Sequence, residues 1–362
     1  MWGVVDKKEI IGIQYLRGIA AVSVVMGHTA VMIGFKKYFG LEPMGGFFES
    51  GARGVDLFFL ISGFIICMIS FRGRHLTPVM SVREFAERRF VRIVPLMWMA
   101  IVSYALLRLL GRGTFEWQAY ARALALFPSG NVEPNTIWTL RHEAIFYCLF
   151  AVSFLSGRFR QLIIGAWFVA PIIYSLSNMP ADPNSPVQSF LFILANPVNI
   201  EFATGFAIGV LWHMRTNGFS FSLPVSPLLV FAAAMIGYMF ISHYLGLSFS
   251  NLYSTGISSV TCAVMLFAGV HVRTAPGLLD RVGRLFGDAS YSIYLFHLHF
   301  VSAVLGVWSK VAYSTPILVV LVGTLCIVFG SCLLIHLFVE KPLVRQSRKA
   351  FQHFRVPRRV RL

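Results

Sequence analysis

Residues 15–30 read YLRGIAAVSVVMGHTA, an apolar run interrupted by two ionisable side chains, Arg17 and His28. These residues are eleven positions apart. At about 100° per residue, eleven positions make roughly three turns plus 20°, so on an α-helix both side chains leave the same face, about 16 Å apart along the axis. The run therefore predicts a buried helix that presents a cation at one level and an imidazole at another.

Two interpretations of this helix are open. In lipid, ionisable side chains are costly and usually face a protein interior or a water-filled path where they have a function. Alternatively, Arg17 extends to the membrane edge with its charged group in water, and His28 is a hydrogen-bonded side chain of the bundle core. This helix alone does not decide between the two.

Composition places the whole chain in a membrane. Of its 362 residues, 57% are hydrophobic and 13% are charged, and the mean hydropathy is +0.71. Soluble domains have about 45–50% apolar and about 25% charged residues. We find no low-complexity tract or internal repeat, so we expect one transmembrane domain over 1–345, followed by a basic cytoplasmic tail over 346–362. The first apolar run has no small-residue cleavage site, which predicts a retained helix.

The fold class predicted is an all-α polytopic bundle of about ten transmembrane helices, because a span needs about 17–25 mainly apolar residues. The ten runs are 10–34, 54–71, 89–110, 136–156, 160–177, 189–213, 224–245, 253–272, 289–309 and 314–339. A short amphipathic helix is expected within 115–127.

Charge predicts the orientation of this bundle. With ten spans both termini share a side, and 21 of the 31 Lys and Arg residues fall on that side, against seven on the other. By the positive-inside rule, the N- and C-termini are expected to be cytoplasmic. The net charge of +16 is explained by these short basic segments, so nucleic-acid binding is not expected. All five cysteines lie in apolar runs without a CxxC pair, which predicts no disulfide and no metal site.

Polar residues are expected at two depths. In the outer third of the bilayer, the spans bring Asp56 and Glu143 to the level of His28, where a carboxylate could orient the imidazole. For Asp56 the alternative is an acidic residue favoured by the dipole at a helix N-terminus. Trp138 and Tyr147 flank Glu143 in the sequence. The alternative to a role at this site is that they are interface aromatics that only pack.

The inner level is cationic. Arg88, Arg89 and Arg92 can share a face near the depth of Arg17, which suits an anionic ligand such as a phosphate group. Positive-inside topology is the alternative explanation for part of this charge. Tyr291, Tyr294 and His297 are expected to face the bundle from the cytoplasmic half, with Tyr294 and His297 three apart on one side. Pro342 is expected to end the last span, where Glu340 would pair with a basic loop in a structural role.

Together these motifs resemble the acyltransferase-3 family of integral membrane acyltransferases. The resemblance covers nearly the whole chain in order and spacing. It rests on Arg-x10-His at 17–28, GVDLFFLISGF at 54–64, Arg-Arg-x-x-Arg-Ile-x-Pro at 88–95, Trp-x-Leu-x-x-Glu-x-x-Phe-Tyr at 138–147, Ser-Tyr-x-x-Tyr-Leu-x-His at 290–297 and Glu-x-Pro at 340–342. Arg141 and His142 depart from the pattern, which has small or acidic residues before Glu143. This departure leaves the ionisation of Glu143 open.

The resemblance implies O-acyl transfer, most often of acetyl from acetyl-CoA to sugar hydroxyls of surface polysaccharides or lipid-linked glycans, in the bacterial cytoplasmic (inner) membrane. On this basis we assign catalysis to His28, Asp56 and Glu143. Donor binding is assigned to Arg17, Arg88, Arg89, Arg92, Tyr294 and His297. The expected contacts are membrane lipid and the glycan, captured by the outer loops 35–53 and 111–135, because the chain ends soon after the last span without the esterase-like domain that some members append.

Two other classes remain as alternatives. A transporter for a lipid-linked sugar or an organic anion would also suit ten spans with intramembrane charges, although no inverted repeat or broken-helix pair is visible in the sequence. A structural scaffold is the third candidate, and buried ionisable groups argue against it.

Overall fold

The computed structural model describes residues 10–112, 115–154, 156–177, 185–215, 220–249 and 251–353. The described chain is almost entirely helical, with one two-stranded hairpin, β1 (Phe71–Arg72) paired antiparallel with β2 (Thr77–Pro78). Nine of the described helical stretches are long and apolar enough to cross a membrane. The predicted all-α membrane bundle is therefore confirmed.

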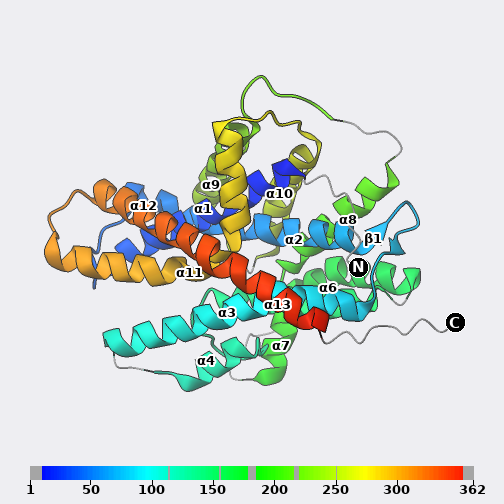
Figure 1. Ribbon diagram of the computed structural model, residues 1–362, viewed down its shortest axis with the longest axis horizontal. Coiled ribbons are helices and arrows are strands. Elements are labelled where there is room, and N and C mark those ends of the chain that lie inside the picture. The colour runs from blue at the N-terminus through cyan, green and yellow to red at the C-terminus, as the bar shows by residue number, and fades with distance from the viewer. Residues whose placement is uncertain are drawn as a thin grey trace.

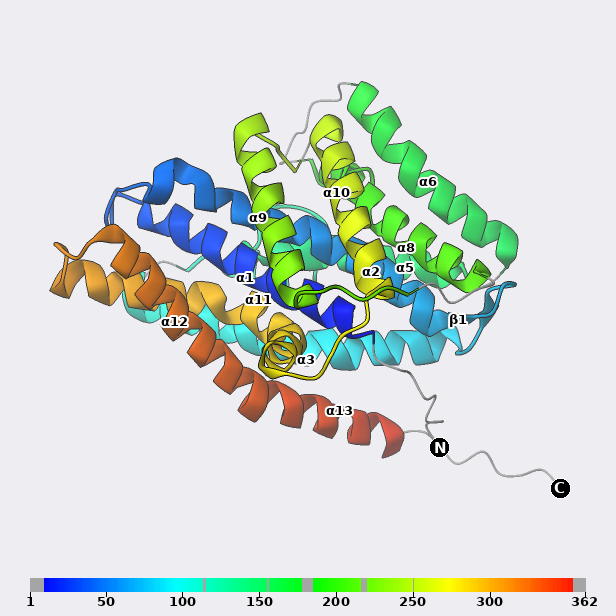
Figure 2. The ribbon, with the colours of Figure 1, turned by 90° about the horizontal axis from the view of Figure 1, so that it is seen from above.

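Helix α1 (Ile11–Ile33) is the central element, and it lies alongside α11 (Leu278–Val311) over much of its length (Figures 1 and 2). The two helices run in the same direction, so successive turns of α1 lie at the same depth as successive turns of α11. Gly287 makes this close approach possible, because a Cβ added there would lie 2.2 Å from the carbonyl oxygen of Gln14. The α1–α11 contact is thus set by backbone rather than by side-chain size.

The other elements surround this pair. The 3-10 helix η1 (Pro43–Arg53) leads into α2 (Gly54–Ser70), which packs along α8 (Asn199–Met214). The remaining helices of the first half are α3 (Val82–Arg112), α4 (Trp117–Leu124), α5 (Ile137–Val152), α6 (Gly157–Leu176) and α7 (Pro186–Leu194). Those of the second half are α9 (Pro227–Leu245), α10 (Leu252–His271), α12 (Ile317–Ile335), η2 (His336–Glu340) and α13 (Lys341–His353).

Three expected spans differ from the observed helices. Helix α5 has 16 residues, or about 24 Å, which is short for a hydrocarbon core of about 30 Å. The run 189–213 is broken at 195–198, where Asn196 and Pro197 separate α7 from α8, so a broken helix is present that the sequence did not reveal. Helix α11 begins at Leu278, well before the predicted start at 289. The short amphipathic helix expected within 115–127 is α4.

Pro342 does not end the last helix, contrary to the prediction. A π turn, η2, precedes it, with the N–H of Lys341 bonded to the carbonyl of His336, and the helix continues as α13. A π turn locally widens the helix, which accommodates a residue without a backbone N–H. Helices α12 and α13 form one orange-to-red stretch along the margin of the bundle opposite α6 (Figure 2). The predicted boundary between 345 and 346 falls within α13.

Candidate active site

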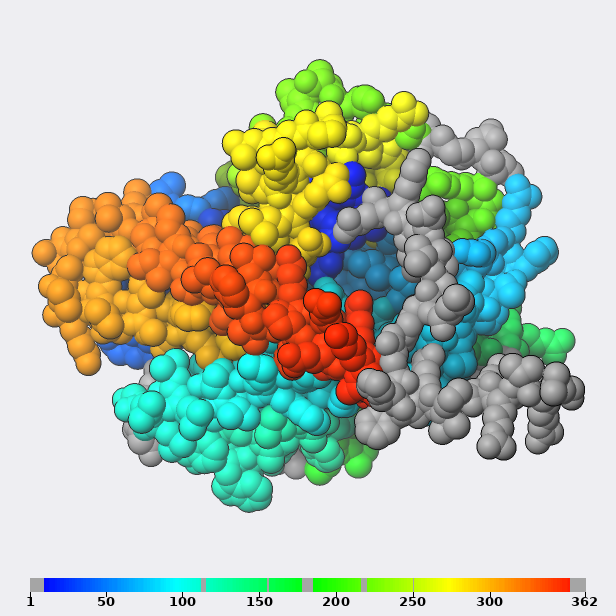
Figure 3. Space-filling view, viewed as in Figure 1, coloured from blue at the N-terminus to red at the C-terminus, as the bar shows by residue number. Residues whose placement is uncertain are grey.

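A cavity of about 690 Å³ runs between α1, α2, α3, α5, α11 and α13. This volume is within the roughly 300–1,000 Å³ of small-molecule sites. In the space-filling view, α13 in red borders a hollow in which blue residues of the first helices are visible (Figure 3). Of the residues assigned from sequence, five line the cavity: Arg17, Arg89, Arg92, Glu143 and Tyr294.

Arg17 is held between α1 and α11. Its guanidinium donates to Ser290 Oγ at 2.8 Å and to Gln14 Oε1 at 3.3 Å. Neither partner is charged, so the positive charge of Arg17 is oriented without being neutralised by these contacts. This is the arrangement that a site for an anionic ligand requires.

Arg89 and Arg92 reach the cavity from α3. Arg92 Nη1 lies 4.0 Å from Glu340 Oε1, and the other carboxylate oxygen of Glu340 accepts from Ser292 Oγ at 2.6 Å and contacts His336 Nδ1 at 2.7 Å. The carboxylate of Glu340 therefore connects η2 to α11 and to Arg92 on α3, which is a structural role. The Arg89 guanidinium lies 5.6 Å from the centre of the Tyr147 ring.

Arg88 does not line the cavity. It forms an ion pair of 2.5 Å with Glu84, one turn earlier on α3. Adjacent positions on a helix point about 100° apart, so Arg88 and Arg89 face different surroundings. The prediction that Arg88 joins the other arginines around one ligand is not supported by its position.

Glu143 faces the cavity from α5. Its carboxylate accepts hydrogen bonds from Tyr147 and, at 3.3 Å, from Ser62 Oγ. The residues before it point elsewhere: Arg141 donates to the carbonyl of Gly130 at 2.7 Å, and His142 lies 3.4 Å from Asn199 Oδ1. The hydrogen bonds of the unusual Arg141 and His142 are therefore directed away from the carboxylate of Glu143.

His28 contacts a residue that was expected elsewhere. Its Nδ1 lies 2.8 Å from Nε2 of His297, whereas Asp56 and Glu143 are not among its hydrogen-bond partners in the described structure. The early start of α11 explains the difference. From Leu278 to His297 the helix rises about 28 Å, and from Ile11 to His28 it rises about 26 Å, so the two imidazoles are level.

The hydrogen bonds of His297 determine the tautomers of the pair. Its Nδ1 lies 2.7 Å from the carbonyl oxygen of Tyr294, which can only accept, so Nδ1 carries hydrogen. In a neutral His297, Nε2 then accepts from Nδ1 of His28. This leaves Nε2 of His28 with a free lone pair, and His28 is partly exposed while His297 is completely buried.

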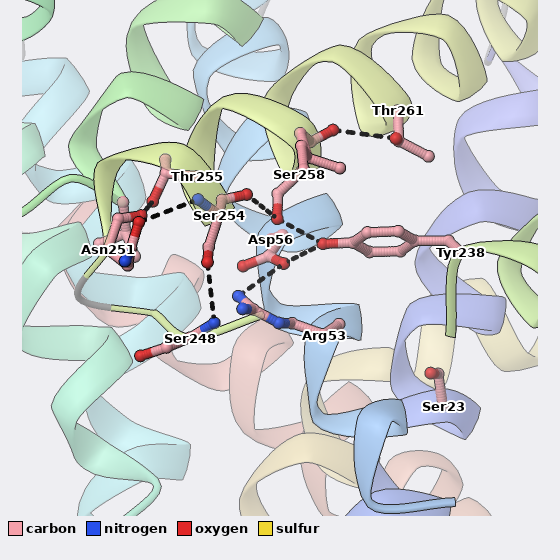
Figure 4. A network of polar contacts seen from close by, with 12 residues as sticks. Ser23, Arg53, Asp56, Tyr238, Ser248, Asn251, Ser254, Thr255, Ser258 and Thr261 are labelled. Atoms are coloured by element: carbon pink, nitrogen blue, oxygen red, sulfur yellow. Dashed lines mark hydrogen bonds and ion pairs between the residues drawn. The ribbon is translucent and has the colours of Figure 1, made fainter. Parts of the chain in front are cut away.

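Asp56 belongs to a different network. It is fully buried and contacts Arg53 Nη1 at 3.3 Å and the hydroxyl of Tyr238 at 2.5 Å (Figure 4). The Tyr238 hydroxyl also lies 2.5 Å from Ser258 Oγ on α10, and the buried carboxyl group of Glu201 interacts with both Asp56 and Arg53. Among the described residues no hydrogen bond joins Asp56 to His28: the polar partners of Asp56 include residues on η1 and α9, so these contacts do not support the predicted role of Asp56 in orienting the imidazole.

Tyr294 stands between the cavity and the histidine pair. Its ring centre is 6.0 Å from that of His297 and 6.0 Å from that of Phe58, and its hydroxyl lies 2.6 Å from Thr139 Oγ1. A ligand that extends from the cavity to His28 must therefore pass beside this ring.

Several lining residues were not identified from the sequence. Ser290 precedes Tyr294 by one turn on the same side of α11, and the four basic residues of α13 also line the cavity. The signal for α13 was present in the spacing of Lys341, Arg345, Arg348 and Lys349, which places them on one helix face. The described residues contain no group of three or more His, Cys, Asp or Glu side chains able to hold a metal ion.

These features define a polytopic membrane protein with a cation-lined cavity bounded by Tyr294, beside which His28 and His297 form a hydrogen-bonded pair. The family model of the acyltransferase-3 group, described as an acyltransferase domain, matches residues 10–336. The chain belongs to this family, and it is a membrane-embedded O-acyltransferase.

Named relatives agree with this membership. The exopolysaccharide production protein ExoZ of Rhizobium meliloti (strain 1021) is 33% identical over 327 residues, covering 85% of this chain and 94% of that protein. The O-acetyltransferase OatA of Staphylococcus aureus (strain NCTC 8325 / PS 47) is 22% identical, covering 94% of this chain and 58% of that protein. The putative peptidoglycan O-acetyltransferase YrhL of Bacillus subtilis (strain 168) is 24% identical, covering 95% and 56%. No solved structure matches significantly.

Proposed function

We propose that this protein transfers an acetyl group from acetyl-CoA to a hydroxyl of a surface glycan such as an exopolysaccharide. The observation that carries the proposal is a cavity lined by cationic side chains and by Tyr294, whose ring centre lies 6.0 Å from that of His297, the hydrogen-bond partner of His28. Similarity to ExoZ and OatA supports the acceptor class and the acetyl group, respectively. The location proposed is the bacterial cytoplasmic membrane, with the donor on the cytoplasmic side.

Charge supports a coenzyme A donor. Seven Lys and Arg side chains line the cavity against three Asp and Glu side chains, a surplus of four positive charges. Coenzyme A carries about four negative charges at neutral pH, about two on its 3′-phosphate monoester and one on each phosphate of its diphosphate. A ligand of that charge would neutralise the surplus.

Length supports the same donor. Arg17 and His28 are separated by eleven residues of one unbroken helix, about 16 Å. An extended pantetheine arm is of this order, so phosphates held by the arginines would leave the thioester near His28. Glu143 lies along this route with Ser62 and Tyr147, and we assign it to positioning the arm.

His28 would act as the general base through its free Nε2. It takes the proton of the sugar hydroxyl, whose oxygen attacks the thioester carbonyl. The carbon–sulfur bond then breaks, and the thiolate receives the proton to give coenzyme A. His297 accepts from Nδ1 throughout and stabilises the imidazolium that forms. Nε2 is also the atom that would carry the acetyl group in a two-step route.

A sided assay tests the function. Sealed proteoliposomes of known orientation are given radiolabelled acetyl-CoA on one face and oligosaccharides of de-acetylated exopolysaccharide on the other. We expect label in the saccharide for the wild type, and about a 10²- to 10⁴-fold lower rate for His28→Ala at equal protein abundance. The control is His299→Gln, since His299 is another imidazole within the bundle, but it lies on α11 and bonds to the carbonyl of Ala100.

The outcomes are distinct. Uptake of label without covalent transfer would identify a transporter and overturn the proposal. Transfer only when both substrates share one face would refute the cross-membrane arrangement and keep the enzyme assignment. Near-wild-type transfer by His28→Ala would refute the mechanism.

A further inference from the structure

Helix α13 extends beyond the membrane-spanning part of the last helix. The continuous helical stretch Ile317–Phe351 has 35 residues, about 52 Å, whereas a hydrocarbon core is about 30 Å thick. Helix α12 contains no charged residue, whereas α13 contains four Lys and Arg residues and no acidic residue. The change in composition places α13 at or beyond the membrane surface.

All four basic residues of α13 line the cavity. Lys341, Arg345, Arg348 and Lys349 follow one helix face and are exposed, so their charged groups reach the open end of the cavity. Within the described part of the chain, no hydrogen bond or ion pair engages these four side chains. They form a concentrated positive surface, here named the α13 basic face.

Two contacts fix this face against the rest of the site. The Phe351 ring lies 5.8 Å from the ring of Phe90 on α3. At the start of α13, Glu340 lies 4.0 Å from Arg92. The α13 basic face is therefore held against the helix that supplies the half-buried Arg89 and Arg92, although it is separate from those two arginines.

The order of charged groups in coenzyme A matches the order of cations in the cavity. The thioester lies at one end of the molecule, the diphosphate follows the pantetheine arm, and the 3′-phosphate on the ribose is farthest from the thioester. With the thioester toward His28, the diphosphate reaches Arg17, Arg89 and Arg92. We propose that the α13 basic face binds the 3′-phosphate of the donor, an inference that rests on the proposed function.

The headgroup of an anionic lipid offers the same phosphate chemistry. A basic helix at a membrane surface attracts such lipids through its Lys and Arg side chains. The position of all four residues on a cavity shared with Arg17 favours the coenzyme, because a helix that served lipid alone would not need its charges at that opening. The experiment separates the two sources.

The test measures binding of coenzyme A and of 3′-dephospho-coenzyme A, which differ by this phosphate alone. Full-length protein is placed in phosphatidylcholine nanodiscs, and the two affinities are compared for the wild type and for Arg345→Ala/Arg348→Ala. The control Arg158→Ala/Arg281→Ala removes the same charge from exposed residues that do not line the cavity. Binding of 3′-dephospho-coenzyme A reports whether each variant is folded.

We expect the wild type and the control to bind coenzyme A about 10- to 100-fold more tightly than the dephospho form. In the α13 variant, we expect this ratio to fall to within about twofold of unity, with binding of the dephospho form little changed. An unchanged ratio in the α13 variant overturns the inference and leaves the donor assignment intact. If the wild type binds neither compound, both the donor assignment and the inference fail.

Phosphatidylglycerol nanodiscs provide the lipid arm. If the α13 basic face binds lipid headgroups alone, the wild type does not distinguish the two coenzymes in either lipid, and the α13 variant retains less phosphatidylglycerol than the control. That result overturns the inference. Loss of the coenzyme ratio on adding phosphatidylglycerol to the wild type supports it, because the lipid then competes for the same phosphate site.

Discussion

The imidazoles of His28 and His297 meet edge to edge, with ring centres 5.0 Å apart and planes inclined by 12°, and Nδ1 of the first lies 2.8 Å from Nε2 of the second. Because the other nitrogen of His297 faces backbone carbonyls, this contact fixes which nitrogen of His28 keeps its lone pair. A buried residue of α11 thus determines which atom of His28 can accept a proton.

His297→Gln and His297→Phe should therefore differ. A glutamine can still offer an oxygen acceptor to Nδ1 of His28, whereas phenylalanine of similar size offers none. We expect the phenylalanine variant to lose about 10²-fold in kcat with little change in KM for the donor, and the glutamine variant to recover much of that loss. Steady-state kinetics in proteoliposomes measure both parameters. Equal losses in the two variants would mean that His297 only fills space.

The neighbouring residues Arg88 and Arg89 provide a sharp test of the donor site. Arg89 lines the cavity, and Arg88 pairs with Glu84 outside it. We expect Arg89→Ala to weaken donor binding about 10- to 100-fold, and Arg88→Ala to change it by less than about twofold. Arg89→Lys should not restore wild-type affinity, since a point charge cannot replace a planar two-point contact. Titration with coenzyme A decides this, and similar losses at both positions would refute the assignment.

Much of the fold followed from the sequence because membrane spans are long and apolar. Helix α1 was expected at 10–34 and is observed at Ile11–Ile33, with Arg17 and His28 both directed at α11. An unbroken helix fixes relative depth and face by geometry alone. The face and the relative depth predicted for residues on one helix therefore agree with the structure.

Contacts between helices were harder to predict. The start of α11 was placed late because residues 278–288 include polar side chains, so His297 was assigned to the wrong level. Asp56 was placed by depth near His28, but depth does not specify direction around the helix axis. Its partner Tyr238 is 182 residues away in sequence, and no local pattern links the two.

Gly287 should be required for the alignment of α1 with α11. A Cβ at this position would lie 2.2 Å from Gln14 O, and the helices would have to separate or slide. Since Arg17–Ser290 and His28–His297 both span this contact, we expect Gly287→Ala to lower both donor affinity and kcat, and to cost about 1–3 kcal/mol of stability. Gly165→Ala on α6 is the control, because nothing lies within 4 Å of a Cβ there. Kinetics and thermal unfolding of both variants in detergent test this, and a fully active Gly287→Ala would contradict the close packing.

Asp56 should behave as a structural residue, and its network offers a test by paired substitution. Arg53 faces the buried carboxyl groups of Asp56 and Glu201, and the pair Arg53–Asp56 is almost completely inaccessible to solvent. Removing one member of a buried ion pair leaves an uncompensated charge and costs about 3–5 kcal/mol, whereas removing both members is often far less costly. We therefore expect Arg53→Leu and Asp56→Leu each to lower the melting temperature and the abundance strongly, and the double variant to recover much of the loss. Protein that remains folded in the double variant should retain most of its specific acyl-transfer rate, because Asp56 does not contact His28. A folded, stable Asp56→Leu variant with an activity as low as that of His28→Ala would instead return Asp56 to the catalytic machinery and refute its assignment to the α2–α9 contact.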